Sequence, residues 1–410
     1  MEQGGAHQQV GTQEKTGGPF EVFLVFLKLG CTAFGGPTAH LGYFREELVN
    51  RRRWLSNAAY ADVIALCQLL PGPTSSQVGM ALGLSRAGMA GLLLAFLGFT
   101  LPSAALMVGF AYGLDAWRDG LSGGWLAGFR AAAVAVVAHA VVGMARDLCP
   151  EWRTRLIALC AVALAFLLGG LAGQFAALAF GLASSFLVPA MRVAGTGTGR
   201  GHGFHVGVSP RMGAALLGVL VGLFLLLPLL AMLTDASFLK MANSFYRTGA
   251  LVFGGGHVVL PLLDAEVVQT GLVPRESFLA GYAAAQAMPG PLFTFAGFLG
   301  ASMNSPPNGW LGAALALCFI FLPSLLMVPA MLPFWARARE LTPVRRMLVG
   351  INAAVVGLLG AALINPVLPE GVTSFASGGL VIAAYVALAM LRWSPVLVVC
   401  GAAIAGALLL

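Results

Sequence analysis

The chain is a succession of long apolar segments separated by short polar ones. The alternating ten-residue strands of a membrane β-barrel do not appear in it. The long apolar runs are 88–114, 125–145, 171–191, 212–233, 309–333, 346–364, 374–391 and 394–410, with a shorter one at 155–169. A helix needs roughly 20 apolar residues to cross the hydrocarbon of a bilayer. The pattern therefore predicts an all-α polytopic membrane protein.

Composition supports this fold class and excludes others. Hydrophobic residues make up 59% of the chain and charged residues only 10%, whereas soluble domains are about 25% charged. The net charge of +7 comes almost entirely from arginines in the polar segments, which is typical of the positive-inside rule and argues against nucleic-acid binding. The six cysteines are scattered and predict no disulfide framework, metal site or cofactor site.

One motif occurs twice: an apolar run that holds a single cation and ends in glycines. The first copy is Phe26-Leu-Lys-Leu-Gly-Cys-Thr-Ala-Phe-Gly-Gly36, and the second is Phe245-Tyr-Arg-Thr-Gly-Ala-Leu-Val-Phe-Gly-Gly255. Lys28 and Arg247 occupy equivalent positions in the two copies. An ionisable side chain within a membrane segment is costly, so this repeated cation is a candidate for function.

A second motif, Gln-x-x-Pro-Gly-Pro, follows each copy of the first. The apolar pieces on either side of the first Pro-Gly-Pro, 58–70 and 74–84, are each too short to cross about 30 Å of hydrocarbon. The pieces beside the second one, 278–288 and 292–303, are equally short. Each motif therefore predicts either one broken span or a re-entrant pair of half-helices.

The repeat extends beyond these motifs and sets the domain organisation. Leu101-Pro-Ser103 matches Leu322-Pro-Ser324, and Gly88 matches Gly309. The expected parts are a disordered N-terminal tail, a first membrane repeat, a Gly/Arg/His-rich linker, a connecting transmembrane helix and a second repeat. Their boundaries are 1–18, 19–191, 192–211, 212–236 and 237–410.

Loop charges predict that the two repeats are inverted in the membrane. The basic cluster Arg51-Arg-Arg53 is matched only by Arg275 after the second copy, whereas the four arginines of the loop at 337–346 are matched only by Arg118 in the first. By the positive-inside rule, equivalent loops then lie on opposite sides, with the connecting helix supplying the odd crossing. A re-entrant hairpin at the first Pro-Gly-Pro reconciles the remaining charges and places the N-terminus in the cytoplasm.

The paired motifs resemble those of the chromate ion transporter family in its long two-domain form. The resemblance rests on Phe34-Gly-Gly-Pro37, the Arg51 cluster with Trp54, Gln68-Leu-Leu-Pro-Gly-Pro73, Phe253-Gly-Gly-Gly-His257 and Gln286-Ala-Met-Pro-Gly-Pro291. It covers residues 20–391. It implies a carrier in the bacterial inner membrane that exports chromate at the expense of the proton-motive force.

Other functions stay open at this point. The substrate could be sulfate or another oxyanion, and the same donors could line a passive anion channel. An intramembrane enzyme is disfavoured because the chain has no nucleophile–base pair and no acidic cluster. The expected partners are the oxyanion, protons and the lipid bilayer, with no nucleic acid. A homodimer is the candidate assembly.

The broken helices supply a chemical basis for binding an oxyanion. A helix that restarts after a break offers free N–H groups and the positive end of its dipole. Proline suits the first helical turn, and glycine lets an anion approach the backbone. The candidate ligands lie at the breaks and beside the two cations: Lys28, Gly35, Gly36, Pro37, Thr38, Gln68, Pro71, Gly72, Pro73, Thr74, Ser75, Ser76, Arg247, Gly254, Gly255, Gly256, His257, Gln286, Pro289, Gly290 and Pro291.

Each of these features also has a purely structural interpretation. Glycine and proline kink transmembrane helices or let them pack tightly, and glutamines hydrogen-bond between helices. Lys28 and Arg247 could snorkel to the interface or pair with a carboxylate such as Glu21 or Asp264. Because the first break is followed by more hydroxyl side chains than the second, it is expected to be the richer site.

Proton coupling needs a group that titrates against substrate binding. The candidates are His257, beside the second glycine cluster, and Glu47 and Glu266, which align across the repeat. Imidazole titrates near neutral pH. Each of the three could instead be an interfacial or salt-bridged group. The glycine motifs also differ, because Gly256 stands where the first copy has Pro37.

Overall fold

The computed structural model describes residues 17–34, 36–117, 124–185, 207–234, 236–253, 259–338 and 342–410. These residues form helices and turns and contain no strand, which confirms the predicted all-α class. Most of the predicted tail, residues 1–16, and residues 192–206 of the predicted linker lie outside the described residues.

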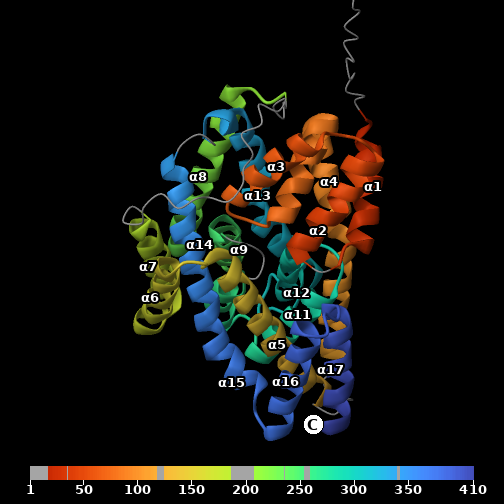
Figure 1. Ribbon diagram of the computed structural model, residues 1–410, viewed down its shortest axis with the longest axis vertical. Helices are drawn as coiled ribbons and strands as arrows, with labels where there is room; N and C mark the ends of the chain where they lie inside the picture. Colours follow the sequence, from red (N-terminus) through yellow and green to blue (C-terminus); the bar gives the residue numbers. More distant parts are fainter. Residues whose placement is uncertain are drawn as a thin grey trace, which may run out of the picture.

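The helices follow the predicted repeat (Figure 1). The first repeat contains α1 (Pro19–Thr32), α2 (Gly36–Phe44), the π-helical turn η1 (Arg45–Arg51), α3 (Asn57–Leu69), α4 (Thr74–Trp117), α5 (Gly124–Leu148), α6 (Trp152–Leu168) and α7 (Gly170–Ser184). The connecting helix is α8 (Pro210–Thr234). The second repeat contains α9 (Ser237–Leu251), α10 (Val259–Leu263), η3 (Asp264–Val268), α11 (Arg275–Ala287), η4 (Leu292–Thr294), α12 (Phe295–Ala301), α13 (Gly309–Ala338), α14 (Thr342–Ala362), η5 (Leu363–Val367), α15 (Leu368–Gly371), α16 (Phe375–Ala389) and α17 (Pro395–Leu409).

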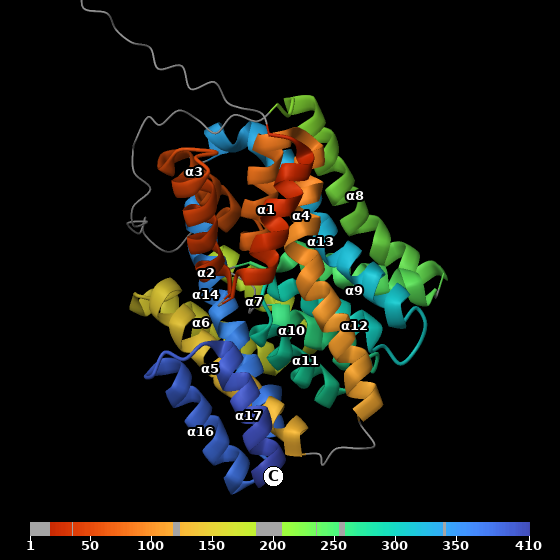
Figure 2. The ribbon, with the colours of Figure 1, turned by 90° about the vertical axis from the view of Figure 1, so that its right-hand side faces the viewer.

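Among the described residues, five helices are long and apolar enough to cross a membrane. They cover Thr74–Leu114, Gly124–Arg146, Pro210–Thr234, Gly309–Trp335 and Val349–Gly371. Only 11% of the apolar window of α8 is buried within the protein. Its leucine-rich surface lies along one edge of the molecule (Figure 2), where lipid would cover it.

Helix α4 consists of two helices that fold back on each other. Ala87 and Gly88 have non-helical dihedral angles, and Gly88 has a φ of 63°. A Cβ on Gly83 would meet the carbonyl oxygen of Gly91, and a Cβ on Gly91 would meet that of Gly83. In a straight helix these residues would be about 12 Å apart. Residues 74–86 are therefore a half-helix that precedes the long arm of α4.

The half-helix and α3 form a hairpin around Pro71-Gly-Pro73. Its two outer ends lie together, because Arg86 at the end of the half-helix lies 5.1 Å from the ring of Trp54, just before α3. Arg86 also contacts Glu21 near the start of α1, at 3.2 Å. Of the two predicted arrangements, a single broken span and a hairpin of half-helices, the structure has the hairpin.

The second repeat contains the equivalent hairpin, formed by α11 and α12 around Pro289-Gly-Pro291. Its outer ends also meet: Asn304, after α12, donates hydrogen bonds to the carbonyls of Gly271 and Leu272 before α11, at 3.1 and 3.0 Å. The chain then reverses into α13, where Gly300 and Gly312 lie against each other as Gly83 and Gly91 do.

Equivalent helices of the two repeats run antiparallel. Phe96 on α4 packs on Phe321 of α13 at 5.0 Å, whereas Tyr112 packs on Trp310 at 5.5 Å, so numbering rises on one helix as it falls on the other. Figure 2 shows α1, α2 and α3 in the upper half of the molecule and α10, α11 and α12 below them. This is the relation expected of inverted repeats.

The repeats also exchange packing partners. Helix α5 packs against α16 and α17 of the second repeat, and its equivalent α14 packs against α6 and α7 of the first. Glycines allow this: the backbone of Ala402 lies where a Cβ on Gly128 would be, and Gly181 lies where a Cβ on Gly350 would be. The two repeats therefore interlock as one body.

A pair of glycines on α5 tests this packing. A side chain at Gly128 would displace the backbone of α17, whereas a Cβ at Gly143 meets nothing within 4 Å. We predict that Gly128→Val lowers the free energy of unfolding by about 1–3 kcal/mol, as overpacking does. Gly143→Val is the matched control and should leave the unfolding midpoint of the purified protein nearly unchanged. Equal midpoints for the two variants would contradict the interlocked arrangement.

Candidate functional site

Each Pro-Gly-Pro break donates a hydrogen bond to the end of a helix in the opposite repeat, and the two bonds are equivalent in the repeat. The N–H of Gly72 donates to the carbonyl of Val252 at 2.6 Å, and the N–H of Gly290 donates to the carbonyl of Ala33 at 2.9 Å. Ala33 and Val252 are the C-caps of α1 and α9, directly before the two glycine clusters. Each break is therefore bound by the glycine-ended helix of the opposite repeat.

Only glycine fits at the centre of each break. Gly72 and Gly290 have φ values of 121° and 91°, which other residues rarely adopt. A Cβ on Gly72 would fall on the hydroxyl of Ser324, and a Cβ on Gly290 would fall on that of Ser103. The repeated Leu-Pro-Ser segments of α4 and α13 thus supply the surface on which the opposite break packs.

Polar side chains gather where α4 begins, after the first break. The ring of His40, on α2, lies with Nδ1 3.2 Å from the hydroxyl of Ser75. The amide of Gln77 donates to the carbonyl of Pro71 at 2.6 Å and to Ser324 at 3.1 Å. Within the described chain, His40 Nε2, Ser76 Oγ and Gln77 Oε1 are buried without a hydrogen-bond partner. Such atoms are costly unless something fills the site.

The second break is less polar. Phe293 and Phe295 are fully buried next to it, and the hydroxyl of Thr294 donates to the carbonyl of Pro291 at 2.8 Å. The expected difference between the breaks is therefore present in the structure: the first carries the unpartnered donors and acceptors.

Lys28 and Arg247 each pair with a carboxylate, and the two pairs are equivalent in the repeat. Lys28 Nζ lies 3.4 Å from Glu47, and Arg247 Nε lies 2.8 Å from Glu266, whose oxygen also contacts the Arg247 terminal nitrogen. Both carboxylates are buried. Pairing was anticipated, but with other partners: Glu21 instead contacts Arg52 and Arg86, and Asp264 contacts Arg275.

The pair in the first repeat carries more positive charge. Arg51 and Arg52 each lie 2.9 Å from Glu47, whereas Thr270 and Gly271 occupy the equivalent positions near Glu266. Burial by itself raises the pKa of Glu47, which lies outside the candidate spans. The hydrogen bonds from Arg52 and Lys28 and the nearby positive charges outweigh that effect, so the pKa of Glu47 lies below its usual value.

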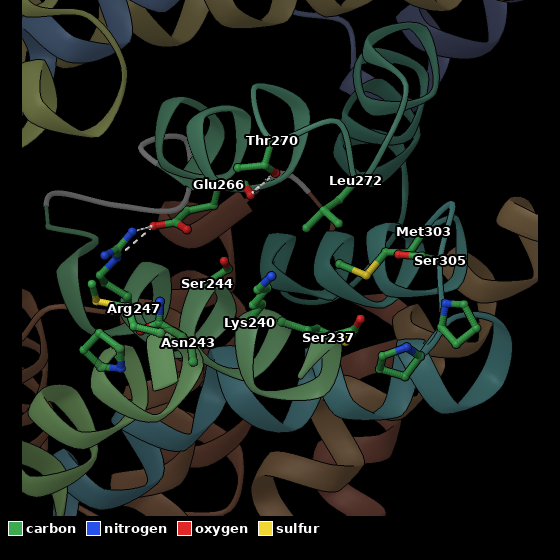
Figure 3. Close-up of a pocket in the computed structure, with 16 residues that line it drawn as sticks. Ser237, Lys240, Asn243, Ser244, Arg247, Glu266, Thr270, Leu272, Met303 and Ser305 are labelled. Atoms are coloured by element: carbon green, nitrogen blue, oxygen red, sulfur yellow. Dashed lines mark hydrogen bonds and ion pairs between the residues drawn. The ribbon is translucent and has the colours of Figure 1, made fainter. Parts of the chain in front are cut away.

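The second pair lies in the wall of an open pocket of about 820 Å³ (Figure 3). Arg247 and Glu266 share this wall with Lys240 and Ser244 of α9. Met303 and Ser305, in the turn after α12, line another part of the pocket (Figure 3), and residues near the end of α8 complete the lining. The Arg247–Glu266 pair is thus accessible from an open pocket that can hold water.

Some predicted site residues lie away from the start of α4, and others lie outside the residues that the structure describes. Gln68 is exposed on α3 and Gln286 is half-buried on α11. Gly36 and Pro37 form the start of α2, while the side chain of Thr38 is not described. The residues outside the described ranges are Gly35, Gly254, Gly255, Gly256 and His257. Their predicted roles stay predictions.

Sequence reasoning missed four residues of the site. Ser103 and Ser324 had a signal, because they match across the repeat. The sequence holds no such signal for His40 and Gln77, because the equivalent residues of the second repeat are Val259 and Phe295. Their importance comes from the contacts around the break, which no spacing along the chain reveals.

Comparison with known proteins agrees with the two-repeat organisation. The chain matches the family model described as chromate transporter over residues 20–187 and 239–407, one match for each repeat. It is 29% identical to the chromate transport protein of Pseudomonas aeruginosa over 378 residues, covering 87% of this chain and 85% of that protein. No solved structure matches the chain.

Two further relatives match this chain over a similar share of its length. The probable chromate transport protein of Synechococcus elongatus is 28% identical over 83% of this chain and 82% of its own length. The chromate transport protein of Cupriavidus metallidurans is 27% identical over 84% of this chain and 81% of its own length. With both repeats matched, the chain belongs to the chromate transporter family.

Proposed function

We propose that this protein is a secondary transporter that exports chromate, or a closely similar dianionic oxyanion, and that the proton-motive force drives it. One observation carries the proposal. Each break is bound by a helix end of the opposite repeat, and the start of α4 after the first break combines the free N–H groups of a helix N-terminus with unpartnered atoms of His40, Ser76 and Gln77. The chromate transport activity named for the relatives supplies the substrate class.

The start of α4 suits a tetrahedral oxyanion. The first turn of a helix has N–H groups without intrahelical partners and carries the positive end of the dipole. Thr74, Ser75 and Ser76 add hydroxyl donors on this turn. We therefore assign the central anion site to this turn, with His40 and Gln77 as further ligands.

A helix N-terminus alone is too weak to hold a dianion in the membrane. Its dipole contributes about 0.3–1 kcal/mol, and up to about 2 in favourable sites, whereas desolvating an unpaired ion costs tens of kcal/mol in an apolar medium. Lys28 and Arg247 supply the missing charge. Each lies five residues before a cap that contacts the opposite break, about 7 Å along its helix.

The ion pairs also provide a coupling mechanism. Glu47 and Glu266 occupy the cations much as an oxyanion would, so an arriving anion competes with them. The competition acts mainly on Glu266, because Glu47 keeps Arg51 and Arg52 when an anion takes Lys28. A carboxylate displaced from its cation in a buried site favours the protonated form. Anion binding and proton uptake then support each other, and a proton travels with the anion.

This coupling fixes which part of the proton-motive force drives export. One proton carried with each dianion leaves one net negative charge to move outward. A membrane potential of 100 mV, negative inside, favours that movement by about 2.3 kcal/mol. A pH gradient, acid outside, opposes it by about 1.4 kcal/mol per unit. We therefore expect the electrical component to drive export.

Radiolabelled chromate flux in energised inside-out vesicles tests the proposal. We predict saturable chromate uptake that valinomycin with potassium abolishes, because it removes the membrane potential. Nigericin, which removes only the pH gradient, should leave uptake unchanged or increase it. Unlabelled sulfate shows by competition whether the site prefers chromate. Uptake that persists after a protonophore has collapsed both gradients would contradict coupled transport.

Replacing the paired carboxylates tests the coupling step. In proteoliposomes at alkaline pH, a chromate gradient should carry protons in the same direction, reported by a trapped pH-sensitive dye. The double variant Glu47→Gln/Glu266→Gln should carry chromate without protons, since an amide does not titrate. Glu276→Gln is the control, because that exposed carboxylate pairs with Arg130 at 3.2 Å outside the site. Proton movement that survives in the double variant would overturn the mechanism.

A further inference from the structure

The two buried carboxylates that pair with the repeated cations are held in different ways. Lys28 reaches Glu47 from α1, at 3.4 Å. Arg51 and Arg52 also contact Glu47, both at 2.9 Å. These two arginines lie at the end of the same π-helical turn as Glu47, so they stay beside it irrespective of its distance from α1. An anion that takes Lys28 therefore leaves Glu47 paired and ionised.

Glu266 has its cation on a different element. The carboxylate belongs to η3, and Arg247 contacts it from α9, with both guanidinium contacts on the same oxygen, Oε1. Thr270 and Gly271 stand where the first repeat has its two further arginines. An anion that takes Arg247 therefore separates that guanidinium from a carboxylate side chain that is only 6% exposed. A buried carboxylate parted from its cation favours the protonated form.

The other charged side chains around η3 contact one another. The elements packed on η3 are α7, α9, α10 and α11, and neither α7 nor α10 contains an ionisable residue. On α11, Arg275 contacts Asp264 of η3 at 3.5 Å. The next residue, Glu276, contacts Arg130 of α5 at 3.2 Å. These charges are thus compensated apart from the Arg247–Glu266 pair.

Lys240, on α9, lines the same pocket as Glu266 and as a cation favours the ionised form of that carboxylate. It lies two helical turns from Arg247, about 10 Å along the helix. A dianion on Arg247 brings two negative charges to the place that Glu266 has just left, at much shorter range. The net effect of its arrival is to favour protonation of Glu266.

Water can reach Glu266 through the pocket of about 820 Å³, in whose wall it pairs with Arg247 (Figure 3). One water molecule occupies about 30 Å³ in the liquid, so the pocket has room for a continuous cluster of water. Its lining includes the side chains of Asn243, Ser244 and Thr270, which can hydrogen-bond to water. The pocket therefore offers a path for protons to and from Glu266.

We propose that Glu266 is the coupling carboxylate of this transporter and exchanges its proton through this pocket, whereas Glu47 stays ionised. When an oxyanion takes Arg247, the Glu266 carboxylate accepts one proton from water. When the anion leaves, the carboxylate returns to Arg247 and releases that proton to water. On the face of the membrane where the pocket opens, the pocket is the route of this exchange. The inference rests on the proposed function and selects one of two carboxylates that the repeat makes equivalent.

Single variants test the assignment in the proteoliposome assay of proton movement. Glu266→Gln should carry chromate without the accompanying protons, because its amide does not titrate. Glu47→Gln is the matched variant and should keep the wild-type ratio of protons to chromate. Glu276→Gln should keep that ratio as well.

The pH dependence of the KM for chromate gives a second measurement. At alkaline pH, ionised Glu266 competes with the anion for Arg247, so the wild-type KM should rise by up to about tenfold per pH unit, the limit for one coupled proton. The KM of Glu266→Gln should not change with pH, whereas Glu47→Gln should keep the wild-type slope. A residue that only shapes the site would not alter this slope.

Chemical modification tests the pocket route without transport. A water-soluble carbodiimide with an amine converts protonated carboxyl groups into amides, which mass spectrometry locates. In the purified protein, chromate should raise the modification of Glu266 and leave that of Glu47 unchanged. A bulky maleimide attached to Ser305→Cys, in a chain whose exposed cysteines are replaced by serine, should suppress the modification of Glu266 by filling the pocket.

The outcomes separate this inference from the proposed function. Proton movement that survives in Glu266→Gln, or modification of Glu266 that chromate does not raise, would overturn the assignment while leaving coupled export intact. Saturable chromate flux without any proton movement in the wild-type protein would instead overturn the coupling itself, and the assignment with it.

Discussion

The reciprocal hydrogen bonds between each break and a helix end of the opposite repeat hold the two repeats together at their centre. A helix broken within a membrane leaves backbone groups that lipid cannot satisfy. Here the N–H of Gly72 is satisfied by the carbonyl of Val252, and the N–H of Gly290 by that of Ala33. Each carbonyl is itself freed by the end of a helix. Each hairpin of half-helices is therefore stabilised by the glycine-ended helix of the opposite repeat.

This arrangement explains why the duplicated motifs occur together. A Pro-Gly-Pro break in one repeat requires a helix that ends at the right depth in the other, and the glycine clusters end those helices. Ser103 and Ser324 complete the contact from the long arms of α4 and α13. At the first break, the start of α4 brings helix N–H groups, hydroxyls and His40 into one buried place.

Much of this fold follows from patterns in the chain. The long apolar runs predicted the helices. The duplicated motifs predicted the repeat, and the swapped loop charges predicted its inversion. The lengths of segments 58–70 and 74–84 were compatible with a hairpin of half-helices and with a single broken span, and did not distinguish the two. The partners of Lys28 and Arg247 could not be assigned, because Glu47 approaches α1 only once η1 folds back beside it. His40 and Gln77 break the repeat symmetry, so no comparison of the two copies singles them out.

The departures from symmetry matter as much as the symmetry. Lys28, Arg51 and Arg52 contact Glu47, whereas Thr270 and Gly271 stand near Glu266 where the first repeat has Arg51 and Arg52. If the Lys28–Glu47 and Arg247–Glu266 pairs had the same surroundings, each would bind an anion with the same affinity. Unequal pairs give the two ends of the path different affinities, which we expect in a protein that moves its substrate to one side.

The central claim is that a tetrahedral dianion binds at the start of α4, after the first break. Selenate is such an anion, and its selenium atom scatters anomalously, so crystals soaked in selenate locate it directly. The account predicts an anomalous peak at the start of α4, between Ser76, Gln77 and His40. Peaks confined to exposed loops, with none at the breaks, would contradict it.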